Sequence, residues 1–216
     1  MKRLKTLMFG TALLALGLAG QAPAQAAGNT LVMAWATDAT GLDPHKQTAF
    51  ASIRLLELIY EPLVTLDADL QIQPALAESW AFSDNGTRLT FTLRAGATFH
   101  NGSPVTAADV KASFERILDE ATGAATRANF LSIERIEAPD ARTVVFNLSR
   151  QDAPVLTAMT DLNAAIVPAG EIAAGTIGTQ AIGTGPFRLS SWRPNELSVL
   201  AVNADWWGDG LSHIHI

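Results

Sequence analysis

The sequence contains no cysteine in its 216 residues. Disulfides and a cysteine nucleophile are therefore excluded, and an exported protein of this composition must be held together by its core alone. A bacterial lipoprotein needs a cysteine at its cleavage site for acylation, so a lipid tether is excluded as well. If the protein is exported, we expect it to be free in the periplasm.

Positive charge is also scarce, with 15 Lys and Arg against 21 Asp and Glu. Three of the cations lie within residues 2–5, and removal of residues 1–26 would leave 12 against 21, a net charge of about −9. Nucleic-acid binding depends on cations that neutralise phosphates, so this balance argues against nucleic acid as a partner.

Long apolar runs are limited to one, residues 7–18, which is too short for the roughly 20 residues that span a bilayer. Three cations precede it, and Ala24-Gln25-Ala26 follows with small residues at the spacing of a cleavage site. This order predicts a secretory signal peptide over residues 1–26, and a soluble mature protein that begins near Ala27. A buried N-terminal helix is the alternative, which the charge order disfavours.

After this leader, short strands, turns and amphipathic helices are expected to alternate. The β-branched and apolar residues 30–37 predict a strand, and the Gly- and Pro-containing residues 38–47 predict a loop. Residues 50–60 carry apolar side chains at helical spacing, so they predict a helix that Pro62 ends.

The stretch SWAFSDNGTRLTFTLR is a strong hairpin pattern. Apolar side chains alternate on both sides of Asn85-Gly86, and this dipeptide favours a two-residue turn in which both central residues have a positive φ. Similar alternation predicts further hairpins over residues 133–149 and 186–203, the last one turning at residues 193–196.

A capped helix is expected after the first of these hairpins. Thr106 is a good N-cap and Asp109 stands three residues later, which is a variant of the capping box. Apolar residues at helical spacing then give this helix one buried face. These residues are Val110, Phe114, Ile117 and Leu118.

The remaining chain predicts a helix over residues 153–162, a short strand over residues 164–170 and a loop over residues 175–186. Residues 206–216 predict the entry to one more strand. Because the chain stops inside that pattern, we interpret the sequence as an N-terminal fragment of a larger protein.

The histidines and one tryptophan pair are the first candidates for a site. His100 would need a nucleophile or an acid partner for catalysis, and we interpret it as a turn histidine that bonds local backbone. His213 and His215 share a face of the last predicted strand, but two ligands do not complete a zinc site, so no metal is predicted. Trp206 and Trp207 would point to opposite faces of a strand, so at most one could stack on a ligand, and core packing is favoured for at least one.

The run GTGPF lacks the third glycine and the following helix of a dinucleotide site. It predicts a tight turn in which Gly183 and Gly185 supply freedom in φ. No cofactor is expected from any of these motifs.

Six longer motifs occur in order along the chain: LDPH (42–45), LIYEPLV (58–64), PALAESW (74–80), TFTLRAGATFHNGSPVTAADVKASFERI (90–117), GTGPF (183–187) and NADWWG (203–208). Together they resemble the family 5 extracellular solute-binding proteins of ABC importers, the dipeptide, oligopeptide and nickel-binding group. The resemblance covers nearly all of residues 30–216. Members usually show Tyr-Trp-Gly where this chain has Trp-Trp-Gly, which keeps an aromatic side chain at residue 206.

The resemblance implies the α/β class and a type II periplasmic-binding-protein fold, in which two lobes close on a ligand at a hinge. Residues 27–61 and 166–216 would belong to an incomplete first lobe, and residues 62–165 to a small α+β domain inserted in it. In the peptide binders of the family, the acidic residue that pairs with the ligand's amino terminus lies beyond the part that this chain matches.

The implied function is a periplasmic receptor that binds di- or oligopeptides without chemistry and delivers them to an inner-membrane ABC permease. We expect a monomer when the protein is full length. In the segment after LDPH, Thr48 is predicted to hydrogen-bond the ligand, Ala49 to leave space for the ligand backbone, and Phe50 to offer an apolar wall or simply to belong to the helix core. The alternatives are a secreted hydrolase, for which no nucleophile–base pair is found, and a nickel or metal-complex carrier of the same family.

Overall fold

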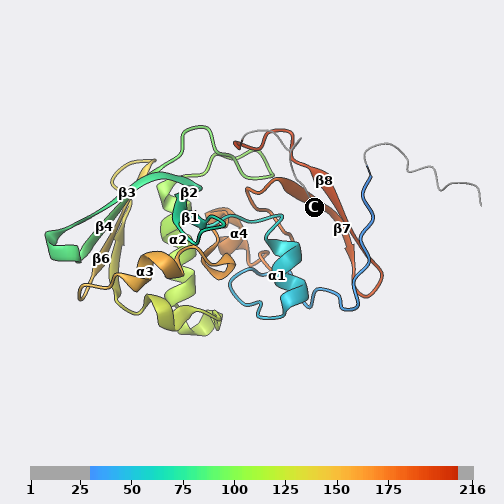
Figure 1. The fold of residues 1–216 in the computed structure, drawn as a ribbon, viewed down its shortest axis with the longest axis horizontal. Helices are drawn as coiled ribbons and strands as arrows, with labels where there is room; N and C mark the ends of the chain where they lie inside the picture. Colours follow the sequence, from blue (N-terminus) through green and yellow to red (C-terminus); the bar gives the residue numbers. More distant parts are fainter. Residues whose placement is uncertain (1–29, 209–216) are drawn as a thin grey trace, which may run out of the picture. The chain divides into compact units, whose positions relative to one another are not determined.

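The computed structural model of the chain describes residues 30–208, and Figure 1 shows the order of its helices and strands. The chain divides into two compact units, residues 1–35 and residues 36–216, and the second unit holds every helix and strand of the described residues. Within residues 30–208, no helix is both long enough and apolar enough to cross a bilayer. The predicted signal peptide and the two C-terminal histidines lie outside the described residues.

The strands are short and form three antiparallel sheets. They are β1 (Val64–Leu66), β2 (Ile72–Pro74), β3 (Ala77–Ser83), β4 (Arg88–Leu93), β5 (Ile133–Glu137), β6 (Thr143–Leu148), β7 (Phe187–Arg193) and β8 (Leu197–Val202). The α-helices are α1 (Phe50–Leu56), α2 (Ala107–Leu118), α3 (Pro154–Ala158) and α4 (Ala169–Ala174). The 3-10 turns are η1 (Asp84–Gly86), η2 (Glu120–Thr122), η3 (Arg127–Phe130) and η4 (Leu162–Ala164).

The main sheet has four antiparallel strands in the order β3-β4-β6-β5. Strand β4 alternates as its sequence predicts, with Leu89, Phe91 and Leu93 buried and the residues between them only partly buried. Opposite it, Trp80 pairs with Phe91 across the first hairpin. The hairpins β3–β4, β5–β6 and β7–β8 therefore confirm the three predicted from alternation.

The turn of the first hairpin is longer than predicted. The last cross-strand pair joins Ser83 to Arg88, so four residues form the loop and the two-residue turn is wrong. Asn85 (φ 55°) and Gly86 (φ 83°) do have the predicted positive φ, and Asp84 (φ 52°) shares it. Three consecutive left-handed residues need more chain than a two-residue turn provides, which is why the loop widens.

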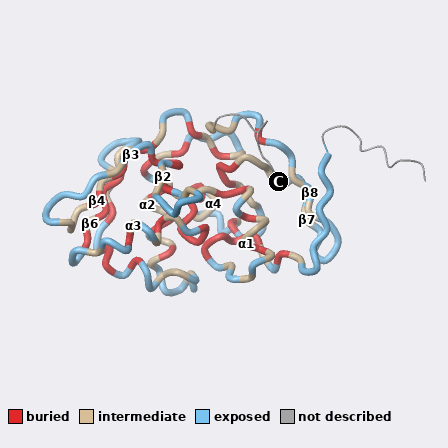
Figure 2. The backbone as a smooth tube through the Cα atoms, in the orientation of Figure 1, coloured by how far each residue is buried: buried red, intermediate tan, exposed pale blue. Residues whose placement is uncertain are grey.

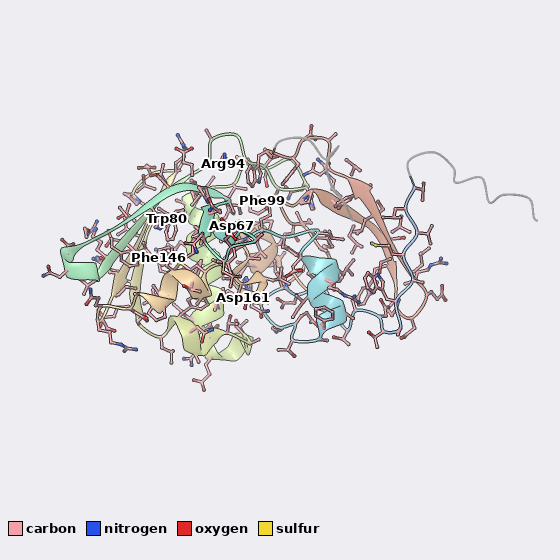
Figure 3. All side chains as sticks on the ribbon, in the orientation of Figure 1. Asp67, Trp80, Arg94, Phe99, Phe146 and Asp161 are labelled. Atoms are coloured by element: carbon pink, nitrogen blue, oxygen red, sulfur yellow. The ribbon has the colours of Figure 1, made fainter. Side chains whose placement is uncertain are left out.

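Helix α2 confirms the capping box. The Asp109 carboxylate accepts hydrogen bonds from the Thr106 backbone N–H (2.9 Å) and from its hydroxyl (2.6 Å). On the buried face, Phe114 meets Phe146 of β6 edge-on, with ring centroids 4.9 Å apart, and Phe130 at 5.3 Å. Buried residues line β4, β6 and α2 in Figure 2, and Figure 3 shows the side chain of Phe146 among them.

The buried hydrophobic residues form two clusters, and the smaller one combines residues 42–60 with residues 162–177. The first cluster draws its buried residues from positions 63–166. The second comprises Leu42, Leu56, Ile59, Tyr60, Leu162, Ala165, Val167 and Ile177. The assignment of residues 62–165 to an inserted domain stays a proposal. The grouping of the buried side chains agrees with its start, whereas near its end Leu162 and Ala165 belong to the second cluster and Ile166 to the first.

Four predictions of secondary structure need correction. The helix predicted over residues 153–162 is shorter, because α3 ends at Ala158 and turn residues follow it. Residues 30–37 form no strand, because a strand requires a ladder of backbone hydrogen bonds and no ladder in the described residues includes them. Residues 164–170 form no strand either: the Ile166 N–H bonds the Glu61 carbonyl (3.0 Å), but the next N–H, of Val167, bonds the Ser113 hydroxyl (3.0 Å). The helix predicted over residues 50–60 ends at Leu56 and continues as a turn.

Candidate ligand-binding site

The three residues predicted to contact a ligand lie together at the start of α1. Ala49 is the N-cap, Thr48 is exposed, and Phe50 is 70% exposed. The Arg54 guanidinium lies over the Phe50 ring, 4.7 Å from the ring centroid. Phe50 therefore does not belong to the helix core, and of its two predicted uses only the surface one agrees with this placement.

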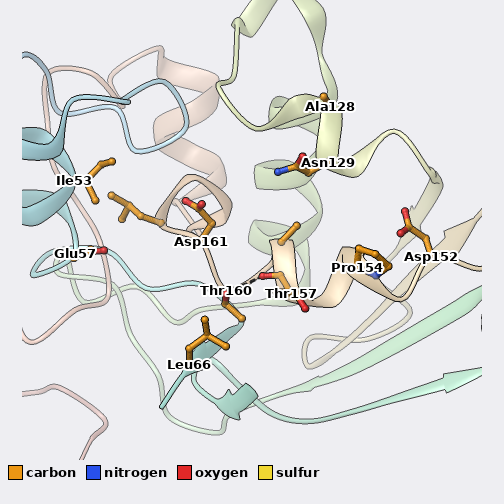
Figure 4. A pocket seen from close by; sticks show the side chains of 12 residues that line it. Ile53, Glu57, Leu66, Ala128, Asn129, Asp152, Pro154, Thr157, Thr160 and Asp161 are labelled. Atoms are coloured by element: carbon orange, nitrogen blue, oxygen red, sulfur yellow. Dashed lines mark hydrogen bonds between the residues drawn. The ribbon is translucent and has the colours of Figure 1, made fainter. Parts of the chain in front are cut away.

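A cavity of about 780 Å³ lies further along the same helix (Figure 4). Ile53 and Glu57 face it from α1, three and seven residues after Phe50, a spacing that places the three on one helix face. The other lining residues come from β1, η3, α3 and the segments around them: Leu66, Ala128, Asn129, Asp152, Pro154, Thr157, Ala158, Thr160, Asp161 and Leu162. Thr48, Ala49 and Phe50 do not line this cavity.

The lining of the cavity is acidic. Glu57, Asp152 and Asp161 contribute carboxyl groups, and no Lys, Arg or His lines the cavity. Among the described residues, none of these three carboxyl groups takes part in an ion pair. Burial raises the pKa of the Glu57 carboxyl, and the negative charge of Asp161 raises it further. Hydroxyl and amide groups of Thr157, Thr160 and Asn129 add hydrogen-bonding capacity beside apolar walls.

Sequence reasoning did not find this cavity. Its residues come from four separated segments, and each carboxylate by itself resembles a surface residue of a helix or a loop. The only local signal was the helical spacing of Ile53 and Glu57 behind Phe50, which becomes informative once the opposite wall is known.

A half-buried carboxylate joins three of the sequence motifs away from the cavity. Glu61 accepts hydrogen bonds from the Thr184 hydroxyl (2.8 Å), the Trp206 indole N–H (3.0 Å) and the Trp207 indole N–H (2.9 Å). Burial raises the pKa of this carboxyl, and the three hydrogen bonds oppose that rise. The prediction that the two indoles point to opposite faces is wrong, because residues 203–208 form turns and no strand.

The two indoles also have packing roles. The Arg94 guanidinium lies 4.1 Å from the centroid of the Trp207 ring, and the Trp206 and Trp207 rings are 5.5 Å apart. Both side chains are thus engaged in structural contacts, and this favours the packing interpretation over ligand stacking for each of them.

His100 is held by distant backbone. Its Nε2 lies 2.9 Å from the Gly185 carbonyl oxygen, and its Nδ1 accepts the Gly183 N–H at 3.3 Å. The prediction of local backbone partners is therefore wrong, although the role remains structural. Burial lowers the pKa of this imidazole, which favours the neutral ring.

The glycines of GTGPF are needed for close approach. Neither has a positive φ, so the predicted freedom in φ is wrong. A Cβ at Gly183 would lie 1.9 Å from the Ile59 carbonyl oxygen, and one at Gly185 would lie 2.8 Å from it. The Gly185 N–H donates to that same oxygen at 2.8 Å, so the two chain segments touch backbone to backbone.

No group of three or more His, Asp or Glu side chains in residues 30–208 is placed to hold a metal ion. His213 and His215, considered for this role in the sequence, lie outside that range.

Comparison with known proteins defines the class. The family model for bacterial extracellular solute-binding proteins, family 5 middle, matches residues 71–215. The probable D,D-dipeptide-binding periplasmic protein DdpA of Escherichia coli (strain K12) is 35% identical over 95% of this chain and 42% of its own length.

Two solved structures share the fold. The binding protein AgaA from A. tumefacien R10, in complex with agropinic acid, has a TM-score of 0.77 and 34% identity, over 81% of this chain and 36% of that one. NikA from Brucella suis, in complex with Fe(III)-EDTA, has a TM-score of 0.72 and 28% identity over the same shares.

The fold is thus that of a type II periplasmic binding protein, α/β in class, as predicted. The chain belongs to the family 5 bacterial extracellular solute-binding proteins. It spans about two fifths of the length of DdpA.

Proposed function

We propose that the protein is a periplasmic receptor that binds di- or oligopeptides without chemistry and delivers them to an ABC importer in the inner membrane. Membership of the solute-binding family supports binding followed by transport. The observation that carries the ligand class is the acidic cavity beside α1, together with the similarity to a probable dipeptide-binding protein.

The cavity suits a ligand with a positively charged amino group. The family resemblance places the acidic partner of the ligand's amino terminus beyond this part of the protein, and Glu57, Asp152 and Asp161 would add further negative charge around that ammonium. The neighbouring threonine hydroxyls and the asparagine amide can bond a peptide backbone. Apolar walls from Ile53 and Leu66 would cover side chains of the ligand. Thr48, Ala49 and Phe50 would extend this surface at the first turn of the same helix.

A metal-complex carrier is the second candidate, because NikA was solved with Fe(III)-EDTA. That chelate is an anion, and a cavity lined by three carboxylates with no basic residue would repel it. A hydrolase is disfavoured because both ring nitrogens of each described histidine are already engaged. His45 bonds the Ala165 carbonyl and the Arg116 guanidinium, and His100 bonds the Gly185 carbonyl and the Gly183 N–H, which leaves neither ring a free nitrogen to act as a general base.

A thermal-shift and calorimetric panel tests the ligand class. The probes are L-alanyl-L-alanine, D-alanyl-D-alanine, their N-acetylated forms and nickel-EDTA. The panel is run on this chain and on a version extended to the full length of its relatives, because this chain spans about two fifths of DdpA. A dipeptide at a hundredfold excess over its Kd should stabilise the extended protein by about 2.7 kcal/mol and this chain much less, while the N-acetylated form, which lacks the ammonium, should not bind. A response to nickel-EDTA with none to dipeptides would replace the peptide proposal by the chelate one.

Variants locate the site. Asp161→Asn and Glu57→Gln should each weaken dipeptide binding about tenfold, the effect of one charge-assisted hydrogen bond of roughly 1.4 kcal/mol, with Glu134→Gln on exposed β5 as the control. Phe50→Ala should weaken binding without loss of stability, since the ring is 70% exposed, and Phe82→Ala is its matched control. Unaltered affinity in all of the site variants would remove this surface from the binding site.

A further inference from the structure

The loop that leads to Thr48 is held by one arginine of α2. The Arg116 guanidinium binds the Asp43 carboxylate through two bonds, Nη1 to Oδ1 at 3.1 Å and Nη2 to Oδ2 at 2.5 Å. The same Nη1 lies 2.7 Å from Nδ1 of His45. All three side chains are buried or nearly so: Asp43 is 7% exposed, His45 is 0% exposed and the Arg116 side chain is 14% exposed.

The contacts of His45 define its tautomer. Its Nε2 lies 2.9 Å from the Ala165 carbonyl oxygen, which can only accept a hydrogen bond, so Nε2 carries the proton. Nδ1 is then the acceptor for the Arg116 N–H. Both bonds are made by the neutral ring, and burial lowers its pKa to about 4, with Arg116 lowering it as well.

Further bonds hold the loop from other elements. The Ala125 N–H donates to the His45 carbonyl at 2.8 Å. The Asn163 side-chain amide donates to the Gln47 carbonyl at 3.0 Å and also to the Pro44 carbonyl. The backbone is therefore fixed up to the residue immediately before Thr48.

The chain is fixed again just after the exposed residues. The Ser52 hydroxyl on α1 accepts the Thr40 N–H at 2.9 Å, and the Thr40 hydroxyl donates to the Gln47 side chain at 2.9 Å. Thr48, Ala49 and Phe50 thus lie between two anchored points, Gln47 and Ser52, while Thr48 and Phe50 project outward.

We infer that Arg116 is a positioning residue for the ligand-contact segment Thr48–Phe50, which it holds by clamping Asp43 and His45 from α2. The inference rests on the proposed function, since it assumes that this segment meets a ligand. A segment ordered before binding loses less conformational entropy when the ligand arrives, so the clamp favours affinity without touching the ligand. Arginine is suited to this because its planar fork bonds both carboxylate oxygens of Asp43 through two nitrogens while one of them also bonds His45, whereas lysine has a single nitrogen and cannot form the two parallel bonds.

A nitroxide spin label tests the clamp, because the sequence has no cysteine and one introduced cysteine is labelled uniquely. The label is placed at exposed Thr48 (Thr48→Cys) and, in a separate chain, at exposed Glu134 on β5 (Glu134→Cys). Arg116→Lys should shorten the rotational correlation time at position 48 by about twofold or more and leave position 134 unchanged. Lys111→Met, on the exposed side of the same helix, is the control and should change neither.

Asp43→Asn provides a second variant if Arg116→Lys does not fold, because it keeps the side-chain size and leaves Arg116 a single acceptor oxygen. An unchanged spectrum at position 48 in a folded variant overturns the inference. Equal loosening at positions 48 and 134 also overturns it, because Arg116 would then support the whole fold and not this segment. The unlabelled protein, extended to the full length of its relatives, is titrated with the dipeptide panel in parallel: absence of binding there would refute the proposed function and leave the spin-label result standing.

Discussion

Acidification from pH 7 to about 4.5 should destabilise the fold through the imidazole of His45. This ring is fully buried and its pKa is lowered from 6.5 to about 4, first by burial, while the bond to the Ala165 carbonyl opposes the shift and the charge of Arg116 adds to it. In the unfolded chain the ring takes up a proton below pH 6.5, whereas the folded chain keeps it neutral down to about pH 4. Stability is therefore intact above pH 6.5 and falls as the pH drops toward 4.

The size of this effect follows from the shift. Each pKa unit corresponds to about 1.4 kcal/mol, so the difference between pH 7 and pH 4.5 amounts to roughly 2–3 kcal/mol of unfolding free energy. For a protein whose total stability is on the order of 5–15 kcal/mol, this loss is easily measured. Protonation would also place a second N–H donor against the Arg116 guanidinium, so the folded ring resists it until the clamp opens.

Urea unfolding followed by circular dichroism at constant ionic strength measures the effect at several pH values between 7 and 4.5. The comparison chain carries His45→Gln, which keeps one donor and one acceptor but does not titrate. Other groups titrate in this range: the raised pKa values of Glu57 and Glu61 act in the opposite direction, and the lowered pKa of His100 acts in the same direction. These contributions are common to both chains and cancel in the difference, so two parallel stability curves would refute the assignment to His45.

The other predictions concern contacts described above. Gly183→Ala should destabilise the chain by about 1–3 kcal/mol or more in the same urea titration, because the added Cβ overlaps backbone that cannot move aside. Gly178→Ala is the control: its Cβ would meet nothing within 4 Å, so the free energy of unfolding should be nearly unchanged. Trp207→Phe removes one donor from the half-buried Glu61 carboxylate and should cost about 1–3 kcal/mol at pH 7. The cost should be smaller at pH 4.5, because the raised pKa of Glu61 favours its protonated form there, which needs fewer donors, and an equal cost at both pH values would contradict this. Gly86→Val places a β-branched residue at φ 83° and should cost about 1–3 kcal/mol, so an unchanged melting temperature would count against a strained turn.

Local patterns in the sequence predicted most of the regular structure. The capping box of α2 depends on residues within four positions of one another, so the sequence alone predicts it. Alternation on β4 predicts which side chains are buried, and its hairpin partner β3 lies next to it in the sequence. The same local view failed for residues 30–37 and 164–170, because β-propensity does not reveal whether a partner strand exists. Local patterns also failed to explain Gly183. Glycine is needed there because the Ile59 carbonyl leaves no space for a Cβ, and not because of the φ of the residue itself.

The family motifs in the sequence identified the class of protein. They did not reveal which contacts each motif residue makes in the folded chain. Only the tertiary structure brings Glu61 to Thr184 and the two indoles, His100 to Gly185, and Arg116 to Asp43. These partners are separated by 73 to 146 residues, and a pattern along the chain carries no information on which distant groups will meet. The acidic cavity has the same origin: each carboxylate is an ordinary polar residue in the sequence, and packing of four segments places them around one volume with no basic side chain in its lining.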